Sequence, residues 1–439
     1  MTPPTSDGAP ESRLLRVVGT WGLAAGIVNI TIGGGIFRLP SGVYALLGGA
    51  SLIAYVICAL VMGLVVTCFA EAGSRVSLTG GLYAYIEVAF GPLVGFVAGA
   101  LLWAGVTAAT AAVASFFGDA LAALVPSFAS PAMHTAIIVT VLAGLAALNV
   151  FGVGVATRFI GIMTVAKLAP LAIIIVAGFL SLHTDRLALG PMPSTGDLGR
   201  GSIFLIFAFL GVEAALVPSG EVRTPARTVP RAIGLALALV VVIYIGVQVV
   251  AQSALGPALA TSKTPIADAA GVLLGPAGRT LVLVGSALSI FGYVSGMTLA
   301  VPRMLFAFGR DGLLPTRLAA VHSRFRTPHV AIIVQTVINI VLATTGTFEQ
   351  LAIAANGAIL LVYGCCAVAV VVLRRKGVGS SGAFVAPLGG VVPALALAAV
   401  VWLLTSLTSR EWIAQAIIAA AALVVFAVTR RARIGSEGR

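Results

Sequence analysis

The sequence is poor in charged residues, and this scarcity excludes most soluble proteins. Asp, Glu, Lys and Arg make up 9% of the 439 residues, whereas 59% of them are hydrophobic. A soluble globular domain carries about 25% charged residues. The composition therefore predicts an all-α integral membrane protein that crosses the bilayer many times.

Cysteine and histidine are also scarce, and their positions form no catalytic or metal-binding pattern. The cysteines lie in apolar segments without the spacing of a metal site: Cys58, Cys68, Cys365 and Cys366. The histidines lie near predicted helix ends or in loops: His134, His183, His322 and His329. No Ser/His/Asp set and no pair of acids at mid-membrane depth accompanies them. The sequence thus predicts neither an enzyme nor a bound metal or other cofactor.

Long apolar runs dominate the chain, and a spanning helix needs about 20 such residues. Twelve segments qualify, with approximate limits 17–47, 49–69, 92–126, 134–151, 158–182, 200–220, 229–253, 279–308, 328–345, 350–373, 388–408 and 411–430. The link at 71–87 is expected to form short interfacial helices. Residues 1–16 lack the apolar core of a cleavable signal peptide and are expected to be a disordered cytoplasmic tail. Residues 431–439 are expected to be a cytoplasmic tail at the other end.

The 26 Lys and Arg residues are distributed unevenly among the loops. If both termini are cytoplasmic, 19 fall on the cytoplasmic side, six on the other side and one, Lys167, inside the membrane. This bias of about threefold follows the positive-inside rule. We therefore expect a multi-pass protein of the inner (plasma) membrane with both termini in the cytoplasm. The net charge of +12 is explained by topology and does not indicate nucleic-acid binding.

Three consecutive glycines interrupt the first apolar segment. Gly33, Gly34 and Gly35 follow Thr31-Ile32 and precede Ile36-Phe37. Each glycine costs about 1 kcal/mol relative to alanine in a helix interior, and a bilayer core offers no water to freed backbone groups. We therefore predict that this helix unwinds around a substrate.

A second interruption is predicted in the sixth segment, where Gly211 precedes Glu213. An acidic residue in the middle of an apolar membrane segment costs about 2.5–3.5 kcal/mol on insertion scales. The two interruptions lie five helices apart. A repeat unit with an odd number of spanning helices places its second copy in the membrane with the opposite orientation. Their positions therefore predict an inverted-repeat transporter with its site near the midplane.

Four groups of residues resemble the amino acid–polyamine–organocation (APC) transporter superfamily, in its bacterial amino acid permease type. They are residues 33–37 with Pro40, residues 80–83 leading to 90–92, residues 207–213 with 220–230, and residues 302–303 with 310–315. The resemblance covers the first ten segments and implies a leucine-transporter-like fold of 12 helices. Residues 17–182 would form one five-helix repeat, residues 200–373 the inverted second repeat, and residues 388–430 two additional helices.

The resemblance also implies a binding site for an amino acid. Its carboxylate would accept hydrogen bonds from the glycine N–H groups, at the positively polarised start of the second half of the first helix. Its amine would contact carbonyls of the two interruptions, and Phe207 would be an aromatic lid. Gly34 replaces the serine or alanine common in the family, which removes a hydroxyl but keeps the N–H. The expected substrate-binding residues are Thr31, Ile32, Gly33, Gly34, Gly35, Ile36, Phe207, Ala208, Leu210 and Met297.

Lys167 and Glu213 are the expected coupling or gating residues. Relatives with a lysine at this position resemble sodium-independent transporters, in which the ammonium takes the place of sodium. The alternative is that Lys167 reaches the membrane interface. Glu213 either gates the pathway or only caps the lower half of its helix. Arg38 is expected to be exposed in the outer vestibule or to steer the substrate.

The expected function is secondary active transport of a neutral amino acid by alternating access, as proton-coupled symport or exchange, because the predicted pocket is apolar. Glu213 and Asp119 leave open a cationic amino acid or polyamine exchanger. A channel, a non-transporting membrane sensor and an intramembrane enzyme are the alternatives of other classes. The expected partners are the amino acid, the lipid bilayer and protons, and the chain would act as a monomer or homodimer.

Overall fold

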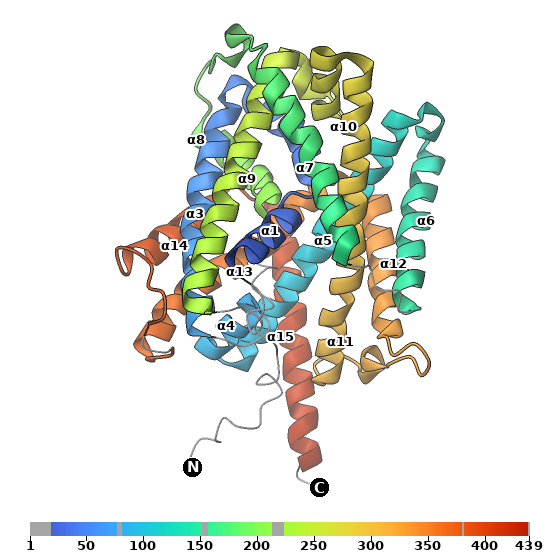
Figure 1. The fold of residues 1–439 in the computed structure, drawn as a ribbon. Coiled ribbons are helices and arrows are strands. Elements are labelled where there is room, and N and C mark those ends of the chain that lie inside the picture. Colours follow the sequence, from blue (N-terminus) through green and yellow to red (C-terminus); the bar gives the residue numbers. More distant parts are fainter. Residues whose placement is uncertain (1–18, 77–80, 152–156, 213–223, 380–381, 438–439) are drawn as a thin grey trace.

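The computed structural model describes residues 19–76, 81–151, 157–212, 224–379 and 382–437. All regular secondary structure in these ranges is helical (Figure 1). The helices are α1 (Thr20–Thr31), α2 (Gly35–Leu47), α3 (Ser51–Arg75), α4 (Leu82–Phe90), α5 (Pro92–Leu124), α6 (Pro131–Val150), α7 (Thr157–Phe179), α8 (Thr195–Ile206), α9 (Pro225–Leu255), α10 (Pro265–Ala300), α11 (Pro302–Arg310), α12 (His329–Thr345), α13 (Phe348–Arg375), α14 (Val391–Leu404) and α15 (Ser409–Glu437).

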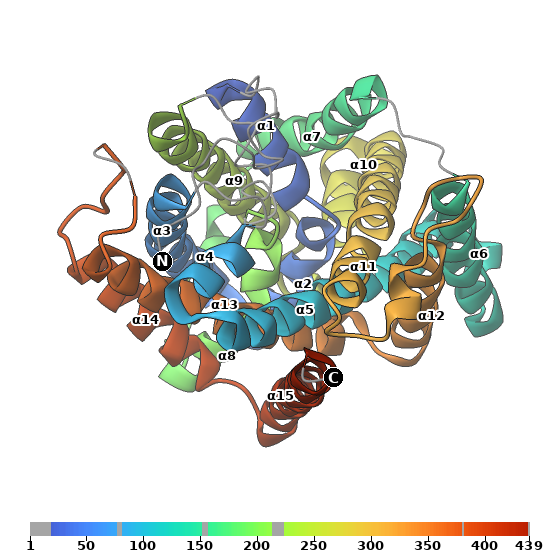
Figure 2. The same cartoon turned by 90° about the horizontal axis from the view of Figure 1, so that it is seen from below.

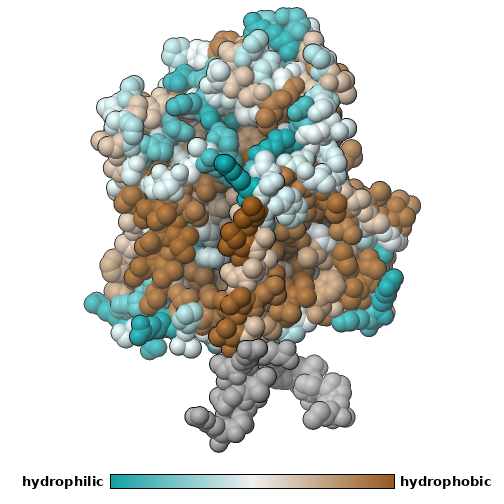
Figure 3. Space-filling view, turned by 180° about the vertical axis from the view of Figure 1, so that it is seen from behind, coloured by the Kyte–Doolittle hydropathy of each residue, from teal (hydrophilic) through white to brown (hydrophobic). Residues whose placement is uncertain are grey.

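The helices are long and apolar enough for a multi-pass membrane protein. Within the described residues, seven helical stretches reach spanning length, namely Gly35–Arg75, Pro92–Leu124, Pro131–Val150, Arg227–Thr261, Pro265–Arg310, Phe348–Arg375 and Ser409–Thr429. Three shorter apolar helices accompany them, at Lys167–Phe179, His329–Thr345 and Val391–Leu404. Hydrophobic residues cover a wide region across the middle and lower part of the surface in Figure 3. The number of twelve crossings and the inverted repeat remain predictions.

The helix boundaries differ from the predicted segments mainly at the ends. The first predicted segment is two helices, because residues 32–34 are not helical. The helix α10 contains a kink at Gly275, whose φ of 72° is left-handed. The helix α3 continues to Arg75, so Glu71 belongs to its last turn rather than to the predicted interfacial link.

Two long helices, α5 and α13, form the centre of the bundle. They pack extensively against each other, and α13 also contacts α3, α4, α8 and α14. Figures 1 and 2 agree in placing α6 and α12 together at one edge, with α14 at the opposite edge. Residues 31–35 and 206–210, which form the two interruptions, are buried inside the bundle.

Candidate functional site

A small cavity lies between the two interruptions. Its volume is about 20 Å³, which is room for about one water molecule. The two interruptions would have to move apart before a ligand of the size of an amino acid could enter. The lining residues are Ile30, Thr31, Gly33, Gly34, Gly35, Ala109, Val113, Phe207, Ala208, Leu210 and Tyr293.

The first interruption exposes backbone donors to this cavity. The helix α1 ends at Thr31 and α2 begins at Gly35. The N–H of Gly33 is already used, because it donates to the carbonyl oxygen of Thr31 at 2.9 Å. The first N–H groups of a helix have no partner within that helix. Gly35 is the first residue of α2 and also lines the cavity, so its N–H group is the natural donor to an anion there.

The second interruption supplies carbonyl groups. The helix α8 ends at Ile206, a single 3-10 turn covers Phe207–Phe209, and Leu210 is extended. Gly211 follows with a φ of 104°, a left-handed conformation that favours glycine. A Cβ on Gly211 would lie 2.8 Å from Cγ2 of Ile30. The two interruptions therefore touch each other, and a larger residue at position 211 would push them apart.

Side chains pack directly against the faces of the glycines. A Cβ added to Gly34 would lie 2.9 Å from Cγ1 of both Ile290 and Val113. A Cβ on Gly35 would lie 3.0 Å from the Phe207 ring. The space that a serine or alanine would need at position 34 is thus filled by two branched side chains, which explains why this chain has glycine there.

Tyr244 connects the two interruptions, and the sequence did not reveal it. This residue of α9 is buried. Its hydroxyl lies 2.6 Å from the carbonyl oxygen of Ala208 and 3.0 Å from that of Thr31. A single hydroxyl proton serves one carbonyl at a time, so the two contacts share one donor. A tyrosine in an apolar helix looks like any other core aromatic residue in the sequence, so no local signal marks this role.

Aromatic residues pack around Phe207, which lines the cavity. The rings of Phe207 and Phe348 are 5.4 Å apart and nearly perpendicular. Phe348 also contacts Phe204 and Phe116. Because Phe348 begins α13, it lies far from the glycine run in sequence, and only the fold brings it against Phe207, which lines the cavity.

Lys167 is buried and reaches α1. Its exposed fraction is 5%, and its Nζ donates a hydrogen bond to the carbonyl oxygen of Asn29. On α10, the Ser289 hydroxyl donates to the carbonyl oxygen of Gly33 at 3.3 Å. The helices α7 and α10 therefore both hold backbone carbonyls beside the first interruption, and the Lys167 side chain points into the protein rather than toward the membrane interface.

The structure brings most, but not all, of the predicted binding residues together. Ile32 and Ile36 are buried but do not line the cavity. Met297 lies one turn beyond Tyr293 on α10, and it is Tyr293 that reaches the cavity. Asp119 lies 3.7 Å from His134, away from the lining residues. Glu213 lies outside the described residues.

A bundle of apolar helices with a small cavity between two helix interruptions is typical of membrane transporters. The family model of amino acid permeases matches residues 18–428. The chain therefore belongs to the amino acid permease family, as its APC motifs indicate.

Its relatives are transporters rather than enzymes. The chain is 29% identical to the serine/threonine exchanger SteT of Bacillus subtilis, over 85% of this chain and 86% of that one. It is 28% identical to a methylthioribose transporter of the same organism, over 95% and 94%. It is 30% identical to the Asc-type amino acid transporter 1 of Mus musculus, over 80% and 69%.

Proposed function

We propose that the protein carries a neutral amino acid across the membrane by alternating access and does so without sodium. The observation that supports this most is the cavity between the two interruptions. None of its 11 lining residues has a charged side chain. A charge buried without a partner is strongly unfavourable, so this described part of the cavity suits a neutral side chain better than a cationic one.

The two interruptions would bind the two ends of the amino acid. The carboxylate would accept hydrogen bonds from the start of α2, where the helix dipole favours negative charge. The amine would contact carbonyls of residues 31–32 and 207–210. The Thr31 carbonyl oxygen already accepts from the N–H of Gly33 and lies within reach of the Tyr244 hydroxyl. Ala208 is the better candidate, because its carbonyl oxygen can accept a second hydrogen bond when Tyr244 donates to it.

The names of the relatives agree with a neutral substrate. One is a serine/threonine exchanger and another is a large neutral amino acids transporter small subunit of Oryctolagus cuniculus. A cationic amino acid or polyamine remains the second candidate through Glu213, which lies outside the described residues. Asp119 supports it less, because it lies beside His134 and not at the cavity.

Lys167 would replace the sodium ion of sodium-coupled transporters. Its ammonium already holds the Asn29 carbonyl, which a cation could otherwise coordinate. Coupling would then depend on protons or on exchange. We further propose that residues 17–182 and 200–373 are the two inverted repeats, that both termini are cytoplasmic, and that the chain works as a monomer or homodimer.

A thermal-shift screen of the purified protein tests the substrate class. The panel contains neutral, acidic and cationic amino acids, polyamines and methylthioribose. A ligand at 100 times its Kd adds about 2.7 kcal/mol to the free energy of unfolding, so neutral amino acids should raise the melting temperature. A shift with arginine or polyamines alone would favour the second candidate, and no shift with any α-amino acid would contradict the proposed site.

A further inference from the structure

The helix α8 ends in a change of hydrogen-bond pattern that takes the usual partner away from one carbonyl group. In a continuous α-helix, the Ile203 carbonyl oxygen would accept from the N–H of Phe207, four residues later. That N–H instead contacts the carbonyl oxygens of Phe204 and Leu205, because the chain tightens there into the 3-10 turn Phe207–Phe209. Ile203 is fully buried, so its carbonyl group needs a donor from elsewhere in the protein.

Asn356 on α13 supplies this donor. Its Nδ2 donates to the carbonyl oxygen of Ile203 at 2.5 Å and also lies 3.4 Å from that of Phe204. The amide nitrogen carries two hydrogens, so it can serve both carbonyl groups at once. Asn356 therefore caps α8 from a neighbouring helix, at the point where the second interruption begins.

The other half of the Asn356 amide shows that this position requires the donor. Asn356 is fully buried, and its Oδ1 has no hydrogen-bond donor among the described residues. A buried acceptor without a donor costs free energy, so an apolar side chain of the same size would fill the space at a lower cost. The amide is therefore explained by its N–H groups, which satisfy the end of α8.

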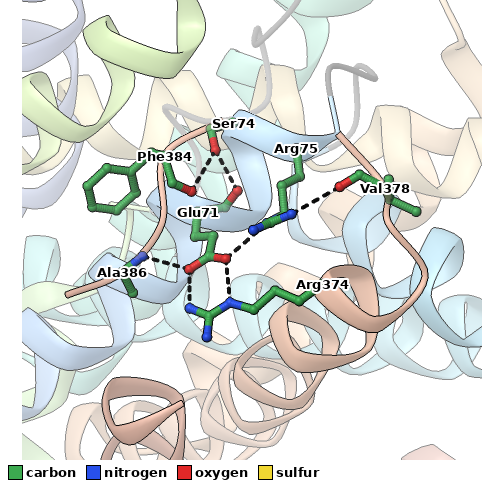
Figure 4. A network of polar contacts seen from close by, with 7 residues as sticks. All are labelled: Glu71, Ser74, Arg75, Arg374, Val378, Phe384 and Ala386. Atoms are coloured by element: carbon green, nitrogen blue, oxygen red, sulfur yellow. Dashed lines mark hydrogen bonds and ion pairs between the residues drawn. The ribbon is translucent and has the colours of Figure 1, made fainter. Parts of the chain in front are cut away.

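The helix α13 presents this donor from a well-restrained position. Its last turn contributes Arg374 to a buried cluster, in which the carboxylate of Glu71 on α3 accepts from Arg374, from Arg75 and from the N–H of Ala386 (Figure 4). Separating these groups would leave a buried carboxylate unpaired, which is strongly unfavourable. The contact with α8 is therefore made by a side chain whose own helix is held in place.

The capped carbonyl lies directly before the residues that line the cavity. Phe207 and Ala208 both line it, whereas Asn356 does not. Without the Asn356 donor, the N–H of Phe207 would be free to return to the Ile203 carbonyl oxygen and continue the α-helix. The 3-10 turn would then be lost, and Phe207 and Ala208 would face in other directions.

We propose that Asn356 is a positioning residue of the transport site, whose amide fixes the residue at which α8 gives way to the second interruption. It thereby sets the orientation of Phe207 and of the Ala208 carbonyl group. This inference rests on the proposed function, because the Ala208 carbonyl oxygen is the proposed contact of the substrate amine. Asn356 holds the start of the interruption, and Tyr244 holds the Ala208 carbonyl within it.

Gln415 on α15 provides a matched control. It is also a buried amide, its Nε2 donates to the carbonyl oxygen of Ala354 at 3.1 Å, and its Oε1 has no partner among the described residues. Ala354 lies inside α13, two residues before Asn356, and neither Ala354 nor Gln415 lines the cavity. Asn356→Leu and Gln415→Leu therefore remove equivalent amides, one at the interruption and one away from it.

Hydrogen–deuterium exchange measures the effect on the interruption without any substrate. Peptides that cover residues 203–212 are followed by mass spectrometry in the purified protein. Asn356→Leu should speed their exchange about twofold to tenfold, as expected for the loss of one hydrogen bond, because two hydrogen-bond patterns then compete for the N–H of Phe207. Gln415→Leu should leave these peptides unchanged. An equal rise in both variants, or no rise in Asn356→Leu, would overturn the proposal.

Asn356→Ala is the second variant, because it removes the same donor without adding volume. It should give the same faster exchange, which keeps the experiment decisive if the leucine variant does not fold. Slow exchange in a folded Asn356→Ala protein would count against the proposal in the same way.

Substrate affinity connects this effect to the site. The Kd of a neutral amino acid identified by the thermal-shift screen should rise about twofold to tenfold in Asn356→Leu. In Gln415→Leu it should equal that of the unaltered protein, although the two variants should have similar melting temperatures. An unchanged Kd together with faster exchange would remove Asn356 from the substrate site. A screen that finds no amino acid would contradict the proposed function, and the exchange experiment would still decide whether Asn356 fixes the end of α8.

Discussion

Removal of the Tyr244 hydroxyl is the most direct perturbation of the contact between the two interruptions. The hydroxyl lies 2.6 Å from the Ala208 carbonyl oxygen and 3.0 Å from that of Thr31. Tyr244→Phe keeps the ring, which packs on Phe209 at 5.3 Å, and removes only the donor. The substitution therefore isolates the hydrogen bond from the packing.

The expected magnitude follows from the geometry. One hydrogen bond contributes about 0.5–1.5 kcal/mol, and a buried group left unpaired costs about 1–3 kcal/mol. We expect Tyr244→Phe to lower the free energy of unfolding by about 1–2 kcal/mol. If the loss of this hydrogen bond destabilises the substrate-bound state by the same free energy, the substrate Kd rises about fivefold to thirtyfold.

Tyr55→Phe is the matched control for this experiment. Tyr55 on α3 is also buried, but its hydroxyl has no hydrogen-bond partner among the described residues. Loss of an unpaired hydroxyl should leave the melting temperature unchanged or raise it. Both variants are compared by thermal unfolding in detergent and by substrate titration. Equal effects of the two substitutions would refute the role of Tyr244 as the connection between the interruptions.

Three further predictions concern the cavity. Gly34→Ala should reduce substrate binding and thermal stability, because the new methyl group would lie 2.9 Å from Ile290 and Val113. Adding Val113→Ala to this variant should partly restore binding and stability. A Gly34→Ala variant with unchanged binding and melting temperature would contradict this packing. Phe348→Ala should lower the melting temperature, since truncation of a buried phenylalanine costs about 3–5 kcal/mol, and should weaken substrate binding, since its ring supports Phe207; unchanged binding in protein that remains folded would argue against this support. Lys167→Ala should abolish proton-driven uptake or uncouple it from the proton gradient, measured as uptake against external pH; an unchanged pH profile would remove Lys167 from the coupling mechanism.

The sequence predicted the features that depend on local chemistry. Three glycines in a row are unfavourable in a helix, so the interruption at residues 32–34 could be located without a structure. Gly211 marked the second interruption for the same reason. These residues carry their signal in their own backbone preferences, which need no knowledge of the neighbours.

The contacts between distant segments could not be predicted in this way. Arg38 was expected to be exposed in the vestibule, yet its partner Glu349 lies 311 residues away. Glu71 was expected in an interfacial link, yet Arg374 and Ala386 satisfy its carboxylate inside the protein. Charged residues near a helix end look the same in a sequence whether they face solvent or a distant partner.

The side-chain pocket was the least predictable part of the site. Met297 was chosen on α10, whereas Tyr293, one turn earlier, lines the cavity. An apolar membrane helix has little amphipathic pattern, because both lipid and protein neighbours are apolar. The rotation of such a helix is therefore set by packing, and a shift of one turn leaves no trace in the sequence.

Uptake into proteoliposomes tests the central claim most directly. Purified protein is reconstituted into liposomes that are loaded with a neutral amino acid identified by thermal shift or that carry a proton gradient. Uptake of the same amino acid in radiolabelled form is then measured, once with sodium present and once with sodium replaced by potassium. The account predicts saturable uptake that is equal in the two salts and is reduced in Gly34→Ala. Uptake that requires sodium would contradict the proposed role of Lys167, and the absence of uptake of any neutral amino acid would contradict the proposed function itself.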